Sequence, residues 1–193
     1  MRAKPLNPEN MNPEVRYVHD EVISLVTRSQ GPVSMVNTEG ALIGPFPPML
    51  RNPQFGIPAL AFVRSLDNHA TLPNKLKEVA ILTVGCIFGT RFILYAHKIM
   101  AEHFGFSNTT VASLASGYRP AELNKAENIA YQMATTLANG NTLSDSLFAN
   151  AIETLKEEGT AELIFLISAY VMLATVLNGF DVPIPEASTN IKI

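Results

Sequence analysis

The chain has 193 residues, of which 47% are hydrophobic and 16% are charged, and its formal net charge is -3. A chain of this length fits one domain. No cluster of Lys and Arg is interleaved with aromatic residues, which argues against a nucleic-acid partner because neutralising phosphates requires a concentrated basic surface. So few charged residues are typical of a surface that another subunit partly covers, and we therefore expect a homo-oligomer.

Cys86 is the single cysteine of the chain, which excludes an intramolecular disulfide framework and a zinc site built from several thiolates. The four histidines show no metal-ligand spacing and there is no Gly-rich phosphate loop, so we expect neither a metal nor a cofactor. Residues 1–15 lack the apolar core of a secretory signal. The most apolar run, residues 163–177, is shorter than the about 20 residues that a membrane span needs. We expect a cytoplasmic protein that does not associate with membranes.

Residues that start and end helices recur along the chain, and no segment alternates apolar and polar residues as a strand would. Asn124 and Glu127, for example, form the capping-box pattern of a helix start. The Gly- and Pro-rich residues 33–48 are expected to form a loop. The predicted helices cover residues 12–31, 52–68, 71–89, 91–104, 107–117, 124–139, 144–159 and 160–178.

These elements predict an all-α protein of about eight helices in a single helical domain. Residues 1–40 would form an N-terminal helix and arm, residues 41–186 the helical domain, and residues 187–193 a tail. The last predicted helix is apolar on every side, so it is expected either in the centre of the core or between subunits.

Glu78 and His97 are the main candidates for chemistry. Apolar residues flank His97 at helical spacing, which places its imidazole on an inward face. Glu78 lies on the preceding predicted helix, beside an apolar run. A buried carboxylate needs a partner, and a hairpin of the two helices at Gly89 would bring Glu78 to His97. The residues alone leave two interpretations open: a functional pair, or a core histidine with an exposed glutamate.

The segment around these two residues resembles the core of the carboxymuconolactone decarboxylase and alkylhydroperoxidase D family. The resemblance covers about residues 41–186 and implies an all-helical, oligomeric fold that acts on a small molecule, with its site on the two helices that carry Glu78 and His97. The segments that carry it are residues 72–78 (LPNKLKE), the apolar run 79–88, residues 96–101 (AHKIMA) and residues 105–107 (GFS).

The chain departs from the family pattern at two positions. In the alkylhydroperoxidase D branch a Cys-x-x-Cys pair precedes the histidine, and those positions are Thr90 and Ile93 here. In many decarboxylase-like members a glutamate stands where Ile93 does. Dithiol peroxide chemistry is therefore excluded, because it needs an attacking thiolate and a resolving thiol. The acid–base version is also weakened, since Ile93 cannot exchange a proton.

The leading hypothesis is a decarboxylase-like lyase in which Glu78 and His97 act as an acid–base pair on a small carboxylate or lactone. One alternative is a peroxiredoxin-like hydroperoxide-handling protein that uses Cys86 with an external thiol, although the apolar neighbours of Cys86 favour a core thiol. Another is an oligomeric scaffold without catalytic activity. Arg91 is a candidate for holding a substrate carboxylate, with an exposed arginine at a helix start as its alternative.

Overall fold

The structure is a computed structural model that describes residues 2–28 and 31–185. Within these residues all regular structure is helical, apart from one isolated bridge between Val36 and Leu42. The α-helices are α1 (Pro13–Arg28), α2 (Phe46–Arg51), α3 (Pro53–Asn68), α4 (Asn74–Ile87), α5 (Arg91–His103), α6 (Asn108–Ala115), α7 (Lys125–Ala138) and α8 (Asp145–Gly179). The predicted all-α fold class is confirmed.

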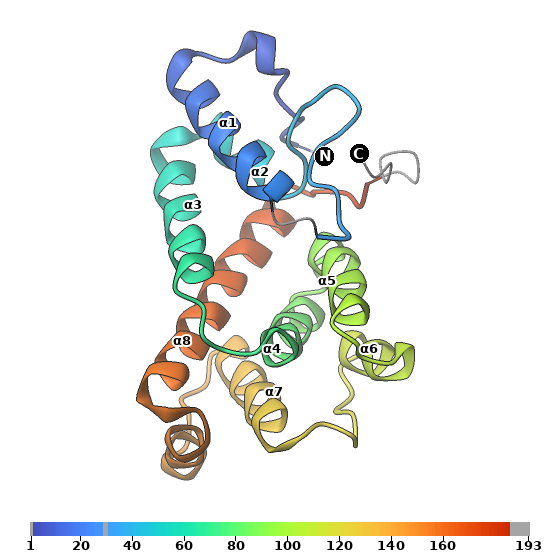
Figure 1. Ribbon diagram of the computed structural model, residues 1–193, viewed down its shortest axis with the longest axis vertical. Coiled ribbons are helices and arrows are strands. Elements are labelled where there is room, and N and C mark those ends of the chain that lie inside the picture. The colour runs from blue at the N-terminus through green and yellow to red at the C-terminus, as the bar shows by residue number, and fades with distance from the viewer. Residues whose placement is uncertain (1, 29–30, 186–193) are drawn as a thin grey trace.

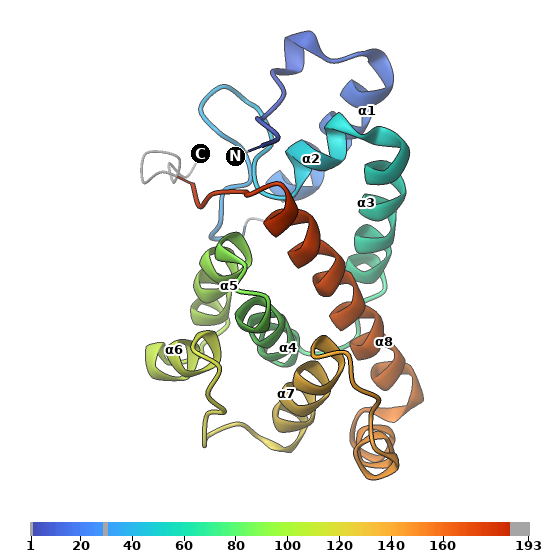
Figure 2. The ribbon, with the colours of Figure 1, turned by 180° about the vertical axis from the view of Figure 1, so that it is seen from behind.

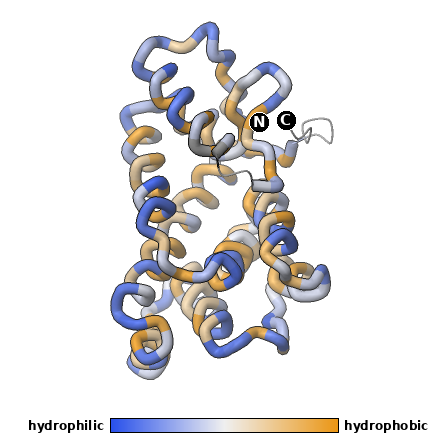
Figure 3. Tube along the Cα trace, viewed as in Figure 1, coloured by the Kyte–Doolittle hydropathy of each residue, from blue (hydrophilic) through white to orange (hydrophobic). Residues whose placement is uncertain are grey.

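Helix α4 is the centre of the core. It packs against α5, α7 and α8, and both ribbon views place it between these helices (Figures 1 and 2). An amphipathic helix has one buried face, but α4 is buried on all sides because its middle is apolar throughout; Val79, Leu82 and Val84 have no exposed surface. The hydrophobic stretches of α4 and α8 run through the middle of the molecule (Figure 3).

The segment α8 consists of two helices joined at a kink, as we predicted. α8 runs from Asp145 to Gly179, and its backbone leaves the helical region at Lys156 (φ 66°, ψ 173°). The kink lies before the predicted boundary at Gly159, which is buried within the second of the two helices, where a Cβ would lie 3.2 Å from Leu72. Thr160 is likewise not a cap, since its hydroxyl donates to the carbonyl of Lys156 within the helix.

The predicted loop 33–48 ends earlier than expected, because α2 already begins at Phe46. Pro47 and Pro48 occupy its first turn. The backbone N–H groups of a first turn have no partner within a helix, so proline is tolerated there and does not break the helix.

The length of helix α8 bears on the expectation that the chain has no segment long enough to span a membrane. By length and composition it is able to cross a membrane, and 44% of its apolar window is buried in the structure. The length argument from residues 163–177 therefore does not hold. Leu163, Ile167 and Ala174 are nevertheless at most 2% exposed in a helix that packs on α4 and α7, which is how the core helix of a globular domain packs. The cytoplasmic location stays a prediction.

The N-terminal arm lies along its own chain. Arg2 bonds through its backbone N–H to the carbonyl of Phe180 (2.9 Å) and through its guanidinium to that of Gly179 (2.8 Å). Further along, the guanidinium of Arg51 donates to the carbonyl of Lys4 (2.7 Å). These contacts place the start of the chain at the C-terminal end of α8. The predicted tail, residues 187–193, lies outside the described residues.

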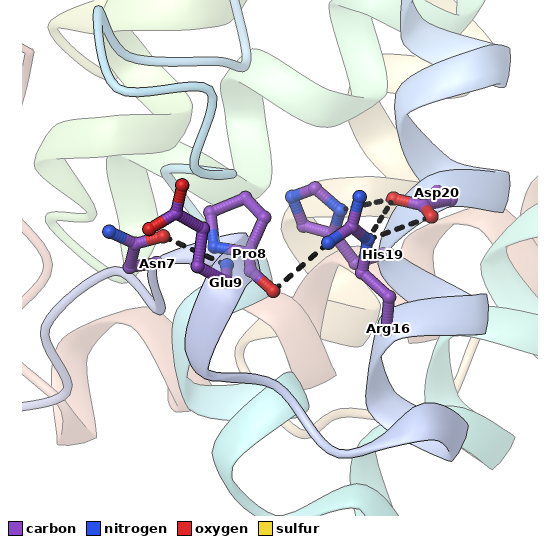
Figure 4. A network of polar contacts seen from close by, with 6 residues as sticks. All are labelled: Asn7, Pro8, Glu9, Arg16, His19 and Asp20. Carbon is purple, nitrogen blue, oxygen red and sulfur yellow. Dashed lines mark hydrogen bonds and ion pairs between the residues drawn. The ribbon is translucent and has the colours of Figure 1, made fainter.

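Helix α1 is joined to the arm by a polar network (Figure 4). Arg16 donates to the carbonyl of Pro8 (3.1 Å) and to the carboxylate of Asp20 (2.8 Å). His19, 3% exposed, places its Nδ1 2.9 Å from the same carboxylate. Hydrogen bonds from His19 and Arg16 hold the pKa of Asp20 below its ordinary value. The contact from Arg16 to Pro8 thus attaches α1 to the N-terminal arm.

Exposed aromatic residues on α3 and α8 indicate where a second copy would pack. Phe55 is 75% exposed at a groove of about 230 Å³ between α2, α3 and the end of α8. Phe165 is 55% exposed and meets Phe62 edge to face. Large exposed apolar groups of this kind often mark interfaces.

The homo-oligomer stays a prediction. Light scattering at micromolar concentration should report at least twice the chain mass of 21.0 kDa. Phe55→Ser should lower that mass. Tyr118 is similarly exposed, at 72%, but does not line this groove, so Tyr118→Ser should leave the mass unchanged. A wild-type chain that measures 21.0 kDa would refute the prediction.

Candidate active site

The start of α4 is held by a carboxylate from α8. Glu162 accepts hydrogen bonds from the backbone N–H (2.9 Å) and hydroxyl (2.6 Å) of Thr71 and from the backbone N–H of Leu72 (3.2 Å). The ammonium of Lys75 donates to the carbonyl of Gly105 (2.9 Å) and lies over the ring of Phe106. α4 is thereby tied both to α8 and to the end of α5.

Helices α4 and α5 form a hairpin in which they approach closely. Gly89 turns the chain with φ +60°, a conformation that glycine adopts without strain. Gly85 makes room for Ile93, because a Cβ on Gly85 would lie 2.8 Å from the Cγ2 atom of Ile93. Ile93 is 3% and Thr90 1% exposed, and the Thr90 hydroxyl is buried without a partner among the described residues. The two positions that carry cysteines in the alkylhydroperoxidase D branch are thus buried positions of the core.

The hairpin brings Glu78 and His97 into contact, as predicted. Nδ1 of His97 lies 2.8 Å from Oε2 of Glu78, and the two side chains are 15% and 6% exposed. A carboxylate on one ring nitrogen orients the imidazole and fixes the proton there. Nε2 makes no hydrogen bond to the residues that the structure describes, and the side chain as a whole is partly exposed.

Two further titratable residues, which sequence reasoning missed, lie beside this pair. The ring of Tyr170 on α8 meets that of His97 edge to face, with the centroids 5.1 Å apart and the planes at 83°. Burial raises the pKa of Tyr170 well above 10.0, and the negative charges of Glu78 and Asp67 raise it further. Tyr170 is the one titratable residue in the apolar run 163–177, and this is the signal by which the sequence could have identified it.

Asp67 contributes a second carboxylate from the end of α3. The residue as a whole is exposed, yet loss of hydration around its carboxyl raises its pKa, against the opposing positive charges of Lys77 and His97. Helices α4, α5 and α8 therefore each supply a titratable side chain to one cluster, and Asp67 of α3 is near enough for its charge to act on Tyr170. Among the described residues no three His, Cys, Asp or Glu side chains gather as metal ligands, and the predicted lack of a metal and a cofactor stays a prediction.

Arg91 and Cys86, the weaker candidates, lie apart from the pair. Arg91 is 62% exposed, and its guanidinium holds the carboxylate of Asp181 at 2.6 Å. The structure therefore agrees with the alternative interpretation of Arg91, which is an exposed arginine at the start of a helix. Cys86 is half-buried, and a Cβ on Gly117 would lie 3.4 Å from its sulfur. The thiol therefore faces the turn that follows α6.

Two solved structures share the arrangement of these helices. A cysteine-to-alanine variant of the debrominase Bmp8, in complex with 2,3,4-tribromopyrrole, matches with a TM-score of 0.71 and 16% sequence identity over 98% of this chain and 94% of that one. The apo form of Bmp8 matches with a TM-score of 0.70 and 17% identity, over 97% and 93% of the two chains. The chain has the fold of Bmp8.

The likeness to Bmp8 extends over nearly the whole of both chains and agrees with the predicted single helical domain of the alkylhydroperoxidase D-like type. At this level of identity it establishes the fold and not the activity. No protein-family model matches the chain, and no curated protein matches it in sequence.

Proposed function

We propose that this chain is a small-molecule enzyme of the carboxymuconolactone decarboxylase-like kind. In this proposal His97 transfers a proton, and Glu78 orients the imidazole and places a negative charge beside it. The observation that carries the proposal is the 2.8 Å contact between Nδ1 of His97 and Oε2 of Glu78. The carboxylate is buried and the imidazole is partly exposed, and Nε2 of the ring makes no hydrogen bond to a described residue. The fold shared with a debrominase supports an enzyme that acts on a small molecule.

The reaction proposed is the decarboxylation of a small carboxylate that carries a conjugated carbonyl or lactone. The bond from carbon to the carboxylate breaks, CO₂ leaves, and the electron pair moves to the carbonyl oxygen to give an enolate. The imidazolium of His97 then gives its proton to carbon, and water restores the proton. Glu78, which bonds to Nδ1, orients the ring and leaves Nε2 as the nitrogen that carries the proton to carbon.

A panel of small unsaturated and oxo carboxylates and lactone acids tests this proposal. Purified protein is incubated with each compound, and release of CO₂ is measured together with loss of the compound. We expect release from at least one member that carries a conjugated carbonyl. If no member reacts while the protein is folded, the catalytic proposal fails in favour of the scaffold.

The peroxiredoxin-like alternative rests on Cys86, whose half-buried thiol is less enclosed than its neighbours predicted. We expect peroxide turnover with a dithiol donor to stay at background, because Thr90 and Ile93 replace the two thiols of that chemistry. Cys86→Ser should behave like the wild type. Clear turnover that disappears in Cys86→Ser would overturn this prediction and establish a one-cysteine peroxidase.

A further inference from the structure

The hydroxyl of Tyr170 has no role in the proposed function as described so far. Its side chain is half-buried in the apolar helix α8, with its ring against His97. Buried tyrosine hydroxyls usually find a hydrogen-bond partner, because an unpaired polar group is destabilising. The hydroxyl of Tyr170 makes no hydrogen bond to any residue in the described parts of the chain and is not one of the fully buried polar atoms that lack a partner, so it is free to donate to a bound molecule beside the ring of His97.

We infer that Tyr170 donates the hydrogen bond that holds the carbonyl oxygen of a substrate beside His97. The inference rests on the proposed function and assigns the group that meets the enolate oxygen. In the proposed reaction negative charge develops on that oxygen, and a donor already in place stabilises the transition state without reorganisation. His97 would then face the carbon that receives the proton, and Tyr170 the oxygen of the same conjugated system.

The phenol is suited to donate and not to act as a base. Burial raises the pKa of the Tyr170 hydroxyl, and the negative charges of Glu78 on α4 and Asp67 on α3 raise it further, so the hydroxyl keeps its proton at neutral pH. The positive groups nearby are His97 itself, when protonated, and Lys77, which acts on Asp67.

The same charges restrict the substrate class. A carboxylate at the Tyr170 hydroxyl would face the carboxylates of Glu78 and Asp67, whereas a neutral lactone or ketone carbonyl would not. The carbonyl becomes negative only as the enolate forms, when the imidazolium of His97 lies beside it. Tyr170 therefore selects a neutral carbonyl, and any carboxylate of the substrate must bind elsewhere.

Tyr170→Phe tests the inference, since it keeps the ring against His97 and removes only the hydroxyl. Tyr131→Phe is the matched control, because Tyr131 is half-buried on α7 and its hydroxyl donates to Gly117 (3.3 Å). The probes are a furanone (an unsaturated five-membered lactone with a neutral carbonyl) and furoate, its carboxylate counterpart. Binding is followed by saturation-transfer NMR, and exchange of the furanone ring hydrogens with D₂O by proton NMR.

In Tyr170→Phe, furanone binding should weaken about fivefold, exchange should fall about 100-fold, and furoate binding should stay as in the wild type. Furanone binding in Tyr170→Phe equal to that in Tyr131→Phe would overturn the inference, and so would a wild type that does not bind furanone. The two proposals fail separately: exchange lost in His97→Ala but retained in Tyr170→Phe refutes only the role of Tyr170. Exchange at the wild-type rate in His97→Ala refutes the proposed function.

Discussion

Replacing His97 by alanine should abolish turnover and lower the free energy of unfolding by about 1–3 kcal/mol. The stability effect follows because the carboxylate of Glu78, 6% exposed, would stay buried after losing the imidazole that bonds to it. The activity effect follows because the proposed proton donor is removed, and a general acid or base contributes roughly 10²–10⁴-fold to a rate. Turnover and urea unfolding of the same preparations measure the two effects.

Glu78→Gln separates the catalytic from the structural role of the pair. Glutamine keeps the shape and one hydrogen bond to the imidazole, so this variant should lose less stability than His97→Ala. It removes the carboxylate that pairs with the ring during proton transfer, so it should also be inactive. His103→Ala is the control, because His103 is exposed at the end of the same helix. An active Glu78→Gln would show that the pair is structural.

Gly56→Ala should destabilise the fold by about 2–4 kcal/mol. A Cβ at this position would lie 2.1 Å from the carbonyl oxygen of Met49 and 2.5 Å from its Cα atom. Both are backbone atoms, so the clash cannot be relieved by a side-chain rotation, and α2 would have to move away from α3.

Gly179→Ala is the matched control for Gly56→Ala, because a Cβ on Gly179 would have no atom within 4 Å. Urea unfolding followed by circular dichroism compares the two variants. Equal midpoints would contradict the close packing of α2 on α3.

Local signals were sufficient to predict most helix starts. Asn124 and Glu127 form the predicted capping box, each side chain accepting from the backbone N–H of the other (both 3.0 Å). The break in α8 was misplaced because it falls at Lys156, whose positive φ is uncommon for a residue with a side chain. Propensity pointed instead to Gly159, a glycine that is present for packing against Leu72.

The candidate site was predictable where its residues are neighbours along the chain. Glu78 and His97 meet because one tight turn joins their helices, a relation that a sequence reveals. Tyr170 reaches the pair because α8 packs on α4, and Asp67 lies on α3, which packs on α8; both depend on packing between segments far apart in the sequence. For the same reason the partner of Arg91, Asp181, was not predicted, since it lies 90 residues along the chain.

The most direct test of the central claim is the transfer of solvent deuterium to a bound lactone. Proton NMR in D₂O follows the ring hydrogens of the furanone. For each exchange, His97 would remove a proton from carbon and then return a deuteron, which is the proton transfer assigned to it. The wild type and His103→Ala should exchange these hydrogens well above the buffer rate, and folded His97→Ala should exchange them at the buffer rate. Exchange by His97→Ala at the wild-type rate would contradict the assignment of His97 as the proton-transfer group.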